Sequence, residues 1–225
     1  MIIFAHRGAS AQAPANSKEA FARARQQGAT CYELDVHLTR DNRLVVQHDY
    51  QVGSTERTVR DFTYPQLQLF CKQQGLKCPD VLEDILPIVR PQLDCLNIEL
   101  KNDNNVYPGI EQVLVDVLRK DAAQIESKIL FSSFDFDTLL RLRGLLPQAQ
   151  IGLLTRSFDP NQARQLNAYS VHINQTRVTP QMVQICHQEN RRVFVYTVNT
   201  KEQQERLAQM GVDGIFTDVP DLFLK

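Results

Sequence analysis

Acidic residues and a histidine alternate with apolar residues in the segment between Cys31 and Asp49. Glu33 and Asp35 share one face of a run whose other face is apolar, which is the period-two pattern of a half-buried strand. A shorter apolar run follows at Leu44–Gln47. The few residues between the two runs leave no room for a crossover helix, so the segment predicts an antiparallel hairpin.

The turn of this hairpin decides which side chains meet. Asp41 and Asn42 suit a two-residue turn, because both residue types tolerate positive φ. That turn places Asp35 opposite His48, with Cβ atoms about 5 Å apart. Two carboxylates and an imidazole would then converge on one point. A salt-bridged hairpin on the protein surface is the alternative, because charged residues are mostly exposed.

Composition narrows the class of protein. A chain of 225 residues can bury a full-sized core. The net charge of −1, without a basic stripe, argues against nucleic acid as the main partner. No apolar run approaches the ~20 residues of a membrane span, and no export signal is evident, so we predict a cytoplasmic protein. The five cysteines match no zinc spacing and indicate reduced thiols, and the oligomeric state is left open.

Short apolar runs alternate with amphipathic segments along the chain. Eight strand–helix units in about 225 residues predict a (β/α)₈ TIM barrel that forms one domain over residues 1–225. The hairpin and a small insertion, residues 50–78, follow the second strand. A doubly wound open sheet is the alternative, but no glycine-rich phosphate loop follows the first strand. The strands are predicted at Ile2–Ala5, Cys31–Val36, Leu96–Leu100, Ile129–Ser132, Ile151–Leu154, Ser170–Ile173, Val193–Thr197 and Gly214–Thr217.

Helices are predicted between these strands. Capping-box spacing from Asn16 to Glu19 and from Asp80 to Glu83 predicts two helix starts, with Gly28 ending the first helix. The other helices are predicted at Gln66–Gln74, Gly109–Arg119, Phe136–Leu146, Asn161–Leu166, Pro180–Glu189 and Lys201–Met210.

Polar residues gather where the first three barrel strands end, which is where such barrels carry their active sites. Three carboxylates this close would repel unless a cation joined them, and oxygen ligands favour Mg²⁺ or Ca²⁺ over zinc. An arginine and a lysine beside them suit a phosphate, and two imidazoles suit proton transfer at neutral pH. This set of groups indicates phosphoester cleavage. The residues expected at this mouth are His6, Arg7, Glu33, Asp35, His48, Asn97, Glu99 and Lys101.

Eight motifs, spread over nearly the whole chain, carry a family resemblance. They are His6-Arg7-Gly8, Pro14–Ser17, Glu33-x-Asp35, His48-Asp49, Ile98-Glu99-Leu100-Lys101, Ser133-Phe134, Tyr196-Thr197-Val198-Asn199 and Gly211-Val212-Asp213-Gly214-Ile215-Phe216-Thr217-Asp218. In this pattern the chain resembles the glycerophosphodiester phosphodiesterase family, in its compact cytosolic bacterial form. It departs from the family at Ala15, where a glutamate is usual.

The resemblance implies a (β/α)₈ barrel that hydrolyses glycerophosphodiesters, such as glycerophosphocholine or glycerophosphoethanolamine, to glycerol 3-phosphate and an alcohol. It also implies a divalent cation, Mg²⁺ or Ca²⁺. One histidine would remove a proton from the glycerol hydroxyl next to the ester while the other protonates the departing alcohol, in an order that the sequence leaves open. The residues it assigns are Glu33, Asp35 and Glu99 for the metal, His6 and His48 for acid/base catalysis, and Arg7 and Lys101 for the phosphate.

Other residues have a functional and a structural interpretation. Phe134 and Tyr196 end barrel strands and would form a pocket wall that contacts substrate, or pack in the core. The remaining expectations are His37 at the rim of the mouth, His172 in a structural position, Asp218 as a helix cap and Asp49 as a residue that orients His48.

The same residues are compatible with two other functions. A lysophospholipase D-like or sphingomyelinase D-like phosphodiesterase would use nearly the same residues on a membrane lipid, although the lack of an export signal and of disulfides speaks against it. A non-catalytic barrel that binds phosphodiesters is the second alternative. The complete histidine pair favours catalysis over binding alone.

Overall fold

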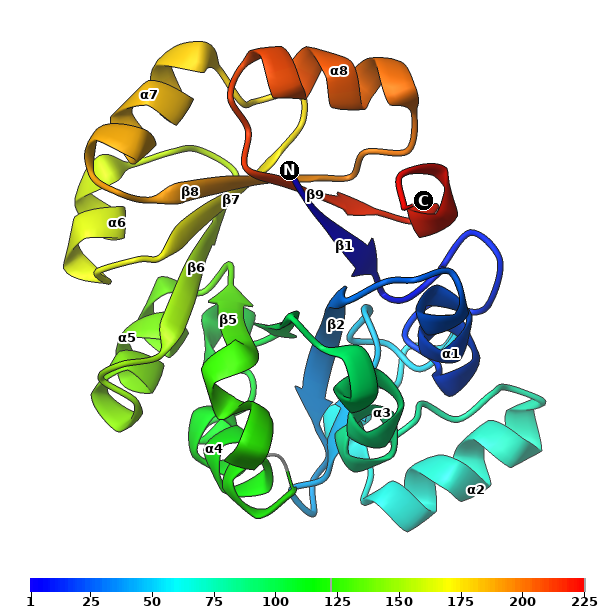
Figure 1. The fold of residues 1–225 in the computed structure, drawn as a ribbon. Coiled ribbons are helices and arrows are strands. Elements are labelled where there is room, and N and C mark those ends of the chain that lie inside the picture. The colour runs from blue at the N-terminus through cyan, green and yellow to red at the C-terminus, as the bar shows by residue number, and fades with distance from the viewer. Residues whose placement is uncertain (122, 225) are drawn as a thin grey trace.

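Eight parallel strands form a closed ring in the structure, a computed structural model that describes residues 1–121 and 123–224 (Figure 1). The strand β1 pairs in parallel with both β9 and β2, which closes the barrel. The prediction of a (β/α)₈ barrel is therefore confirmed. Its strands are β1 (Ile2–His6), β2 (Cys31–Leu38), β4 (Cys95–Leu100), β5 (Ile129–Ser133), β6 (Gln150–Thr155), β7 (Ser170–Asn174), β8 (Arg192–Tyr196) and β9 (Gly214–Thr217).

Helices surround this ring on the outside (Figure 1). None of the helices in the described part of the chain has the length and apolar character needed to cross a bilayer. They are α1 (Lys18–Gln26), α2 (Tyr64–Gln74), α3 (Leu82–Val89), α4 (Ile110–Asp121), α5 (Phe136–Leu145), α6 (Pro160–Gln165), α7 (Pro180–Gln188) and α8 (Lys201–Gln209).

Two predicted helix caps are each wrong by one residue. Ser17, not Asn16, caps α1, because the Ser17 hydroxyl accepts a hydrogen bond from the Ala20 amide. Asn16 has a φ of 58° and turns its side chain towards the barrel. The N-cap of α3 is Val81, while the Asp80 carboxylate accepts from the Lys18 amide instead.

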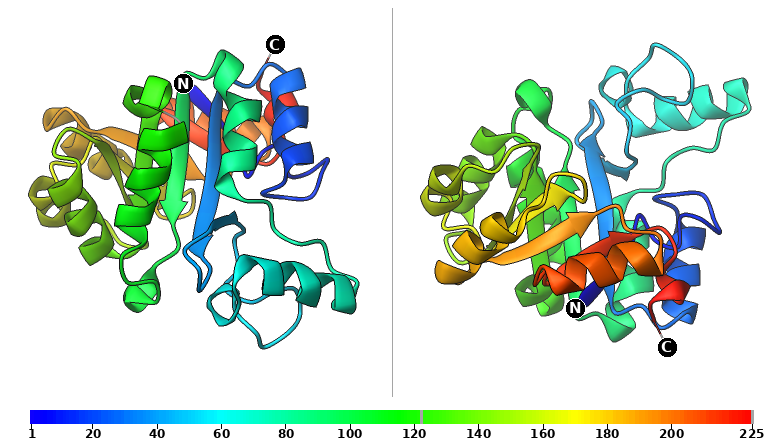
Figure 2. Two further views of the ribbon diagram at one scale, coloured as in Figure 1. Left: turned by 90° about the horizontal axis from the view of Figure 1, so that it is seen from below. Right: turned by 90° about the horizontal axis from the view of Figure 1, so that it is seen from above.

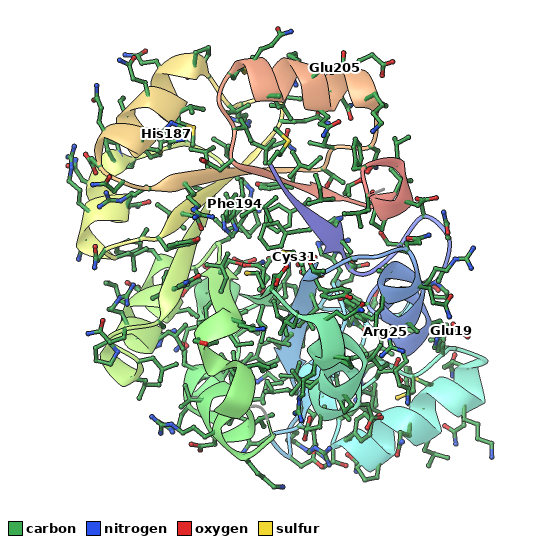
Figure 3. The ribbon with its side chains drawn as sticks, viewed as in Figure 1. Glu19, Arg25, Cys31, His187, Phe194 and Glu205 are labelled. Carbon is green, nitrogen blue, oxygen red and sulfur yellow. The ribbon has the colours of Figure 1, made fainter. Side chains whose placement is uncertain are left out.

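Alternation along the strands separates two apolar layers. Outward-facing residues such as Leu34 and Ile98 pack against the helices. Inward-facing residues at the amino ends of the strands form a small cluster around Phe4, Phe194 and Phe216. Figure 3 shows Phe194 in the middle of the ring, whereas His187 and Glu205 lie on the outer helices.

The hairpin after β2 forms with a different register from the one predicted. Strand β3 (Leu44–Val46) pairs antiparallel with β2, with Val36 opposite Val46 and Leu38 opposite Leu44. Asp35 therefore lies opposite Gln47, not His48. The turn has three residues, because Asn42 adopts a φ of 61° and donates its amide hydrogen to the Thr39 carbonyl.

The segment between β3 and α3, which includes residues 50–78, carries the helix α2. Figure 2 shows α2 beyond the carboxyl end of β2, to one side of the ring. The segment has an apolar cluster of its own that includes Val52, Phe62 and Leu67, and Val45 of β3 packs into the same cluster. The insertion is thus fixed beside the barrel mouth.

Candidate active site

Three carboxylates meet at the carboxyl ends of β2 and β4. Asp35 and Glu99 are register partners on these neighbouring strands, and Glu33 lies two residues before Asp35 on the same face. One carboxylate oxygen from each residue lies within 4.8 Å of the other two, and all three side chains are buried. The structure thus brings together the three residues that the sequence assigned to one site.

Burial and mutual repulsion oppose the ionisation of this cluster. Burial raises the pKa of Glu33 well above its usual value, and the charge of Asp35 adds to the rise. Burial and Asp35 likewise raise the pKa of Glu99 to about 7. Burial also acts to raise the pKa of Asp35, but the positive charges of Arg7 and Lys101 outweigh it and lower that pKa. Without a further cation, the cluster therefore favours retention of a proton.

Two cationic side chains border the carboxylates. The Arg7 Nε lies 3.1 Å from Asp35 Oδ2, and the Arg7 amide donates to Glu33 Oε2 at 3.0 Å. The Lys101 Nζ lies 3.0 Å from Glu99 Oε1 and 3.9 Å from Asp35 Oδ1. Both cations also line the pocket above the cluster, where an anionic group can reach them.

The donor set fits a hard divalent cation. Asn16 fixes Asp35 by donating to its Oδ2 at 2.8 Å, while Asn16 Oδ1 accepts from the Asp35 amide. The other oxygen, Asp35 Oδ1, is buried and has no hydrogen-bond partner among the described residues. Three carboxylates, one of which has a buried oxygen without a partner, match the ligands that Mg²⁺ and Ca²⁺ prefer.

His6 is held by a carboxylate from the far end of the chain. Its Nδ1 lies 2.7 Å from Asp218 Oδ1, and Ser10 and Asn199 also donate to Asp218. Burial would raise the pKa of Asp218, but these hydrogen bonds lower it, so the carboxylate is ionised and accepts the proton on Nδ1. The prediction of Asp218 as a helix cap is wrong, because β9 ends beside β1 in the closed ring and its carboxylate meets His6.

His48 reaches the same pocket from a bend after β3, not from the strand pairing that the sequence predicted. The side chain is 43% exposed, and its Nδ1 lies 2.6 Å from Asp49 Oδ1. The expected contact between Asp49 and His48 is therefore present. In the observed register a continued strand would point His48 away from the face that carries Asp35. The bend turns the side chain back, so that His48 faces the pocket together with His6.

His37 is fully buried, so the prediction that it lies at the rim is wrong. Tyr50 and Tyr107 pack edge-on against its ring and cover it. Its Nδ1 lies 2.9 Å from the Tyr107 hydroxyl, and its Nε2 lies 3.1 Å from the His48 carbonyl. Burial lowers the pKa of His37 to about 4. A neutral His37 thus holds the backbone of the bend that carries His48.

A pocket of about 240 Å³ opens above these groups. Phe134 and Tyr196 form one wall, with ring centroids 6.4 Å apart at 88°. His172 lies at the apolar floor, bonded to Ser170 and packed against Phe194. The residues that line the pocket are His6, Arg7, Glu33, His48, Asn97, Glu99, Lys101, Ser132, Phe134, Leu154, His172, Tyr196 and Phe216.

Four residues support the site in ways that were not predicted from the sequence. Asn16 carried a signal, since it lies in the Pro14–Ser17 motif, but capping-box spacing suggested a different role. Asp218 lies in the last motif, and only closure of the ring brings it to His6. Nothing in the sequence indicates that Tyr50 and Tyr107 would cover His37.

Comparisons with known proteins identify the family of the chain. The glycerophosphoryl diester phosphodiesterase family model matches residues 6–222. A glycerophosphodiester phosphodiesterase of Caldanaerobacter subterraneus subsp. tengcongensis is 34% identical over 99% of the chain and 96% of that protein. A Bacillus altitudinis protein of the same name is also 34% identical, with the same coverage of both chains.

Solved structures share the fold. An Oleispira antarctica phosphodiesterase in complex with the product sn-glycerol-3-phosphate superposes with a TM-score of 0.88, at 24% identity over 98% of the chain and 94% of that structure. The match of the family model to nearly the whole chain decides the assignment. The chain belongs to the glycerophosphoryl diester phosphodiesterase family.

Proposed function

We propose that the chain hydrolyses glycerophosphodiesters to glycerol 3-phosphate and an alcohol, with a divalent cation and with His6 and His48 as the acid/base pair. The family assignment makes the chain a phosphodiesterase. The observation that carries the finer proposal is the buried cluster of Glu33, Asp35 and Glu99, flanked within one pocket by two histidines.

The carboxylate cluster would hold the cation through Glu33, Asp35 and Glu99. When bound, a divalent cation neutralises phosphate charge and makes a nearby hydroxyl more acidic. Arg7 and Lys101 would orient the remaining phosphate oxygens through charge-assisted hydrogen bonds. The substrate half that enters this part of the pocket is the glycerol phosphate, which matches the product bound by the Oleispira antarctica phosphodiesterase.

The two histidines have environments that suit different roles. Because Nδ1 of His6 donates to Asp218, the neutral imidazole presents an unprotonated Nε2. Burial lowers the pKa of His6, which favours this neutral form. We infer that His6 accepts the proton of the glycerol hydroxyl next to the ester. That oxygen forms the new bond to phosphorus as the bond to the alcohol breaks.

The departing alcohol needs a proton, and the structure supports His48 as the donor. His48 is half-exposed at the pocket edge, where the departing alcohol can leave towards solvent, and giving up its proton leaves His48 neutral and able to accept one from water. Water then opens the cyclic phosphate with the two histidines in reversed roles, which gives glycerol 3-phosphate.

A coupled assay for glycerol 3-phosphate tests the proposal, with Mg²⁺, Ca²⁺ or chelator present. His6→Ala and His48→Ala should each lower kcat by about 10²–10⁴-fold, the usual effect of losing a general acid or base. His187→Ala, on the outside of α7 and paired with Asp213, is the matched control and should keep full activity. Full activity in chelator would contradict the role of the cation. Normal turnover by His48→Ala would contradict the role of His48 as general acid.

A further inference from the structure

A second hollow of about 500 Å³ lies beside the barrel mouth. It is formed by the loops that follow the carboxyl ends of β6 and β7 and by the first turns of α7. The residues that line it are Arg156, Ser157, Phe158, Pro160, Ile173, Arg177, Thr179, Gln181, Met182 and Ile185. Two of these are arginines, and among the described residues no aspartate or glutamate lines the hollow.

Arg156 connects this hollow to the catalytic pocket. Its guanidinium carbon lies 4.5 Å from the centre of the Phe134 ring, and Phe134 is part of the wall of the pocket. A substrate whose glycerol phosphate lies on the carboxylate cluster would pass Phe134 with its other half. That half would meet the Arg156 guanidinium next.

Both arginines are available to a ligand. Arg156 and Arg177 are exposed, and within the described ranges neither forms an ion pair with a carboxylate. The acidic residue nearest to Arg156 in sequence is Asp159, which accepts a hydrogen bond from the Asn161 amide as the cap of α6.

This arrangement disfavours a cationic alcohol such as choline. A quaternary ammonium group binds best over the open face of an aromatic ring. Here the Arg156 guanidinium already lies over Phe134, and Arg177 adds a second positive charge in the same hollow. An anion, by contrast, would gain charge-assisted hydrogen bonds from both arginines.

We propose that the hollow lined by Arg156 and Arg177 binds the leaving alcohol, and that this alcohol carries a phosphate group. The proposal rests on the function proposed above and names its preferred class of substrate. In the reaction the phosphorus–oxygen bond to the alcohol breaks and the alcohol oxygen takes a proton. The products are glycerol 3-phosphate and a phosphorylated alcohol, for a net consumption of one water.

Two substrates that differ by a single phosphate give the sharpest test. One is glycerophosphoglycerol, and the other is the same molecule with a phosphate monoester on the terminal hydroxyl of its leaving glycerol. At low ionic strength kcat/KM should be about tenfold higher for the phosphorylated substrate, since an ionic hydrogen bond contributes about that factor. The preference should fall in high salt, which screens exposed charges.

Variants assign the preference to the two arginines. Arg156→Gln and Arg177→Gln should each remove much of the gain from the terminal phosphate, mainly through KM, so that kcat/KM falls several-fold more for the phosphorylated substrate than for glycerophosphoglycerol. Arg119→Gln removes the same charge at the far end of the barrel, where Arg119 lies near Gln150 at the start of β6, and should change neither value.

The outcomes separate this inference from the function on which it rests. Hydrolysis of glycerophosphoglycerol with no gain from the terminal phosphate, or a preference for glycerophosphocholine, overturns the inference and leaves the proposed function in place. Equal losses on both substrates in the arginine variants also overturn it. Failure to hydrolyse any glycerophosphodiester with either cation overturns both.

Discussion

The two ends of the barrel interior differ in chemistry although the same strands build them. On β1, Phe4 belongs to the aromatic cluster at one end and His6 to the pocket at the other. On β2, Cys31 packs in that cluster, and Glu33, two residues later, lies among the buried carboxylates. A step of two residues along a strand thus changes an apolar layer into a charged one.

The contrast shows where the molecule gains stability and where it gives some up. Rings at the amino end pack directly, with Phe4 and Phe216 centroids 4.8 Å apart. At the carboxyl end, burial raises the pKa of Glu33 and Glu99, which means that their charged forms are unfavourable there. Stored electrostatic cost of this kind is typical of sites that bind or react. We therefore expect changes at the two ends to affect different measurements.

Glu99→Gln should produce the largest effect, on activity and not on the stability of the cation-free protein. The amide keeps the shape of Glu99 but removes one of the three charged cation ligands, so kcat/KM should fall at least about 10³-fold, or about 4 kcal/mol in the barrier. Unfolding free energy without added cation should change by less than about 1 kcal/mol, since the relief of repulsion from Asp35 offsets the lost charge opposite Lys101, and the amide oxygen can still accept from Lys101 Nζ.

Thermal unfolding with and without Ca²⁺ or Mg²⁺ gives a second measurement on the same variant. A cation at 100 times its Kd stabilises the native state by about 2.7 kcal/mol, which corresponds to a Tm increase of roughly 5–10 °C for a chain of this length. The wild type should show this increase and Glu99→Gln should lose it. An equal increase in both proteins would place the cation elsewhere.

Phe194→Ala should produce the opposite result. Its ring lies 5.2 Å from that of Phe4 and 5.4 Å from that of His172, so the truncation leaves a cavity that fixed strands cannot fill. We expect a loss of about 3–4 kcal/mol in unfolding free energy by denaturant titration, with kcat per folded molecule within a few fold of wild type. Leu69→Ala, an exposed position on α2, is the control and should cost little.

The difference between the two ends also explains what the sequence could predict. Apolar residues recur in short, regular runs along the chain, and these runs predicted all eight barrel strands to within one or two residues of their observed bounds. Glu33, Asp35 and Glu99 could be placed together because neighbouring parallel strands end at the same edge. Both inferences use only local pattern and general topology.

Two of the predictions failed for different reasons, one at a contact between distant parts of the chain and one in the geometry of a turn. The partnership of His6 with Asp218 spans 212 residues and exists only because the ring closes. The hairpin register failed because the positive φ of Asn42 allowed a three-residue turn, and the bend at His48 then compensated for the shift. The sequence around His6 carries no information on Asp218, and the tolerance of Asn42 for positive φ is compatible with a turn of either two or three residues.

His172→Gln should remove a pH dependence that comes from the apolar end. Burial lowers the pKa of His172 to about 3, whereas an unfolded histidine titrates near pH 6.5. The unfolded state thus binds a proton first as the pH falls below about 6.5, so this group makes the fold less stable by about 2 kcal/mol between pH 8 and pH 5. The variant should show a correspondingly flatter stability profile over this range.

Urea titrations of both proteins at several pH values measure this difference. Glutamine retains a group that can bond the Ser170 hydroxyl, so the comparison at pH 8 reports the packing change alone. His187→Gln changes an exposed histidine and should leave the slope unaltered. Parallel curves for wild type and His172→Gln would show that the ring is not held neutral.

The smallest effect should come from the residues that position the two histidines at the charged end. Asp218→Asn removes the ionised acceptor that keeps the proton on Nδ1 of His6, and we expect a loss of about tenfold in kcat with little change in KM. Asp49→Asn alters the partner of His48, but Asp49 is 73% exposed and adjacent in sequence, so the loss should stay below about threefold. Because both substitutions remove one carboxylate charge beside a histidine, their ratio isolates the effect of burial from that of charge. Equal losses of kcat in the two variants would mean that the position of Asp218 inside the closed ring does not strengthen its effect on His6.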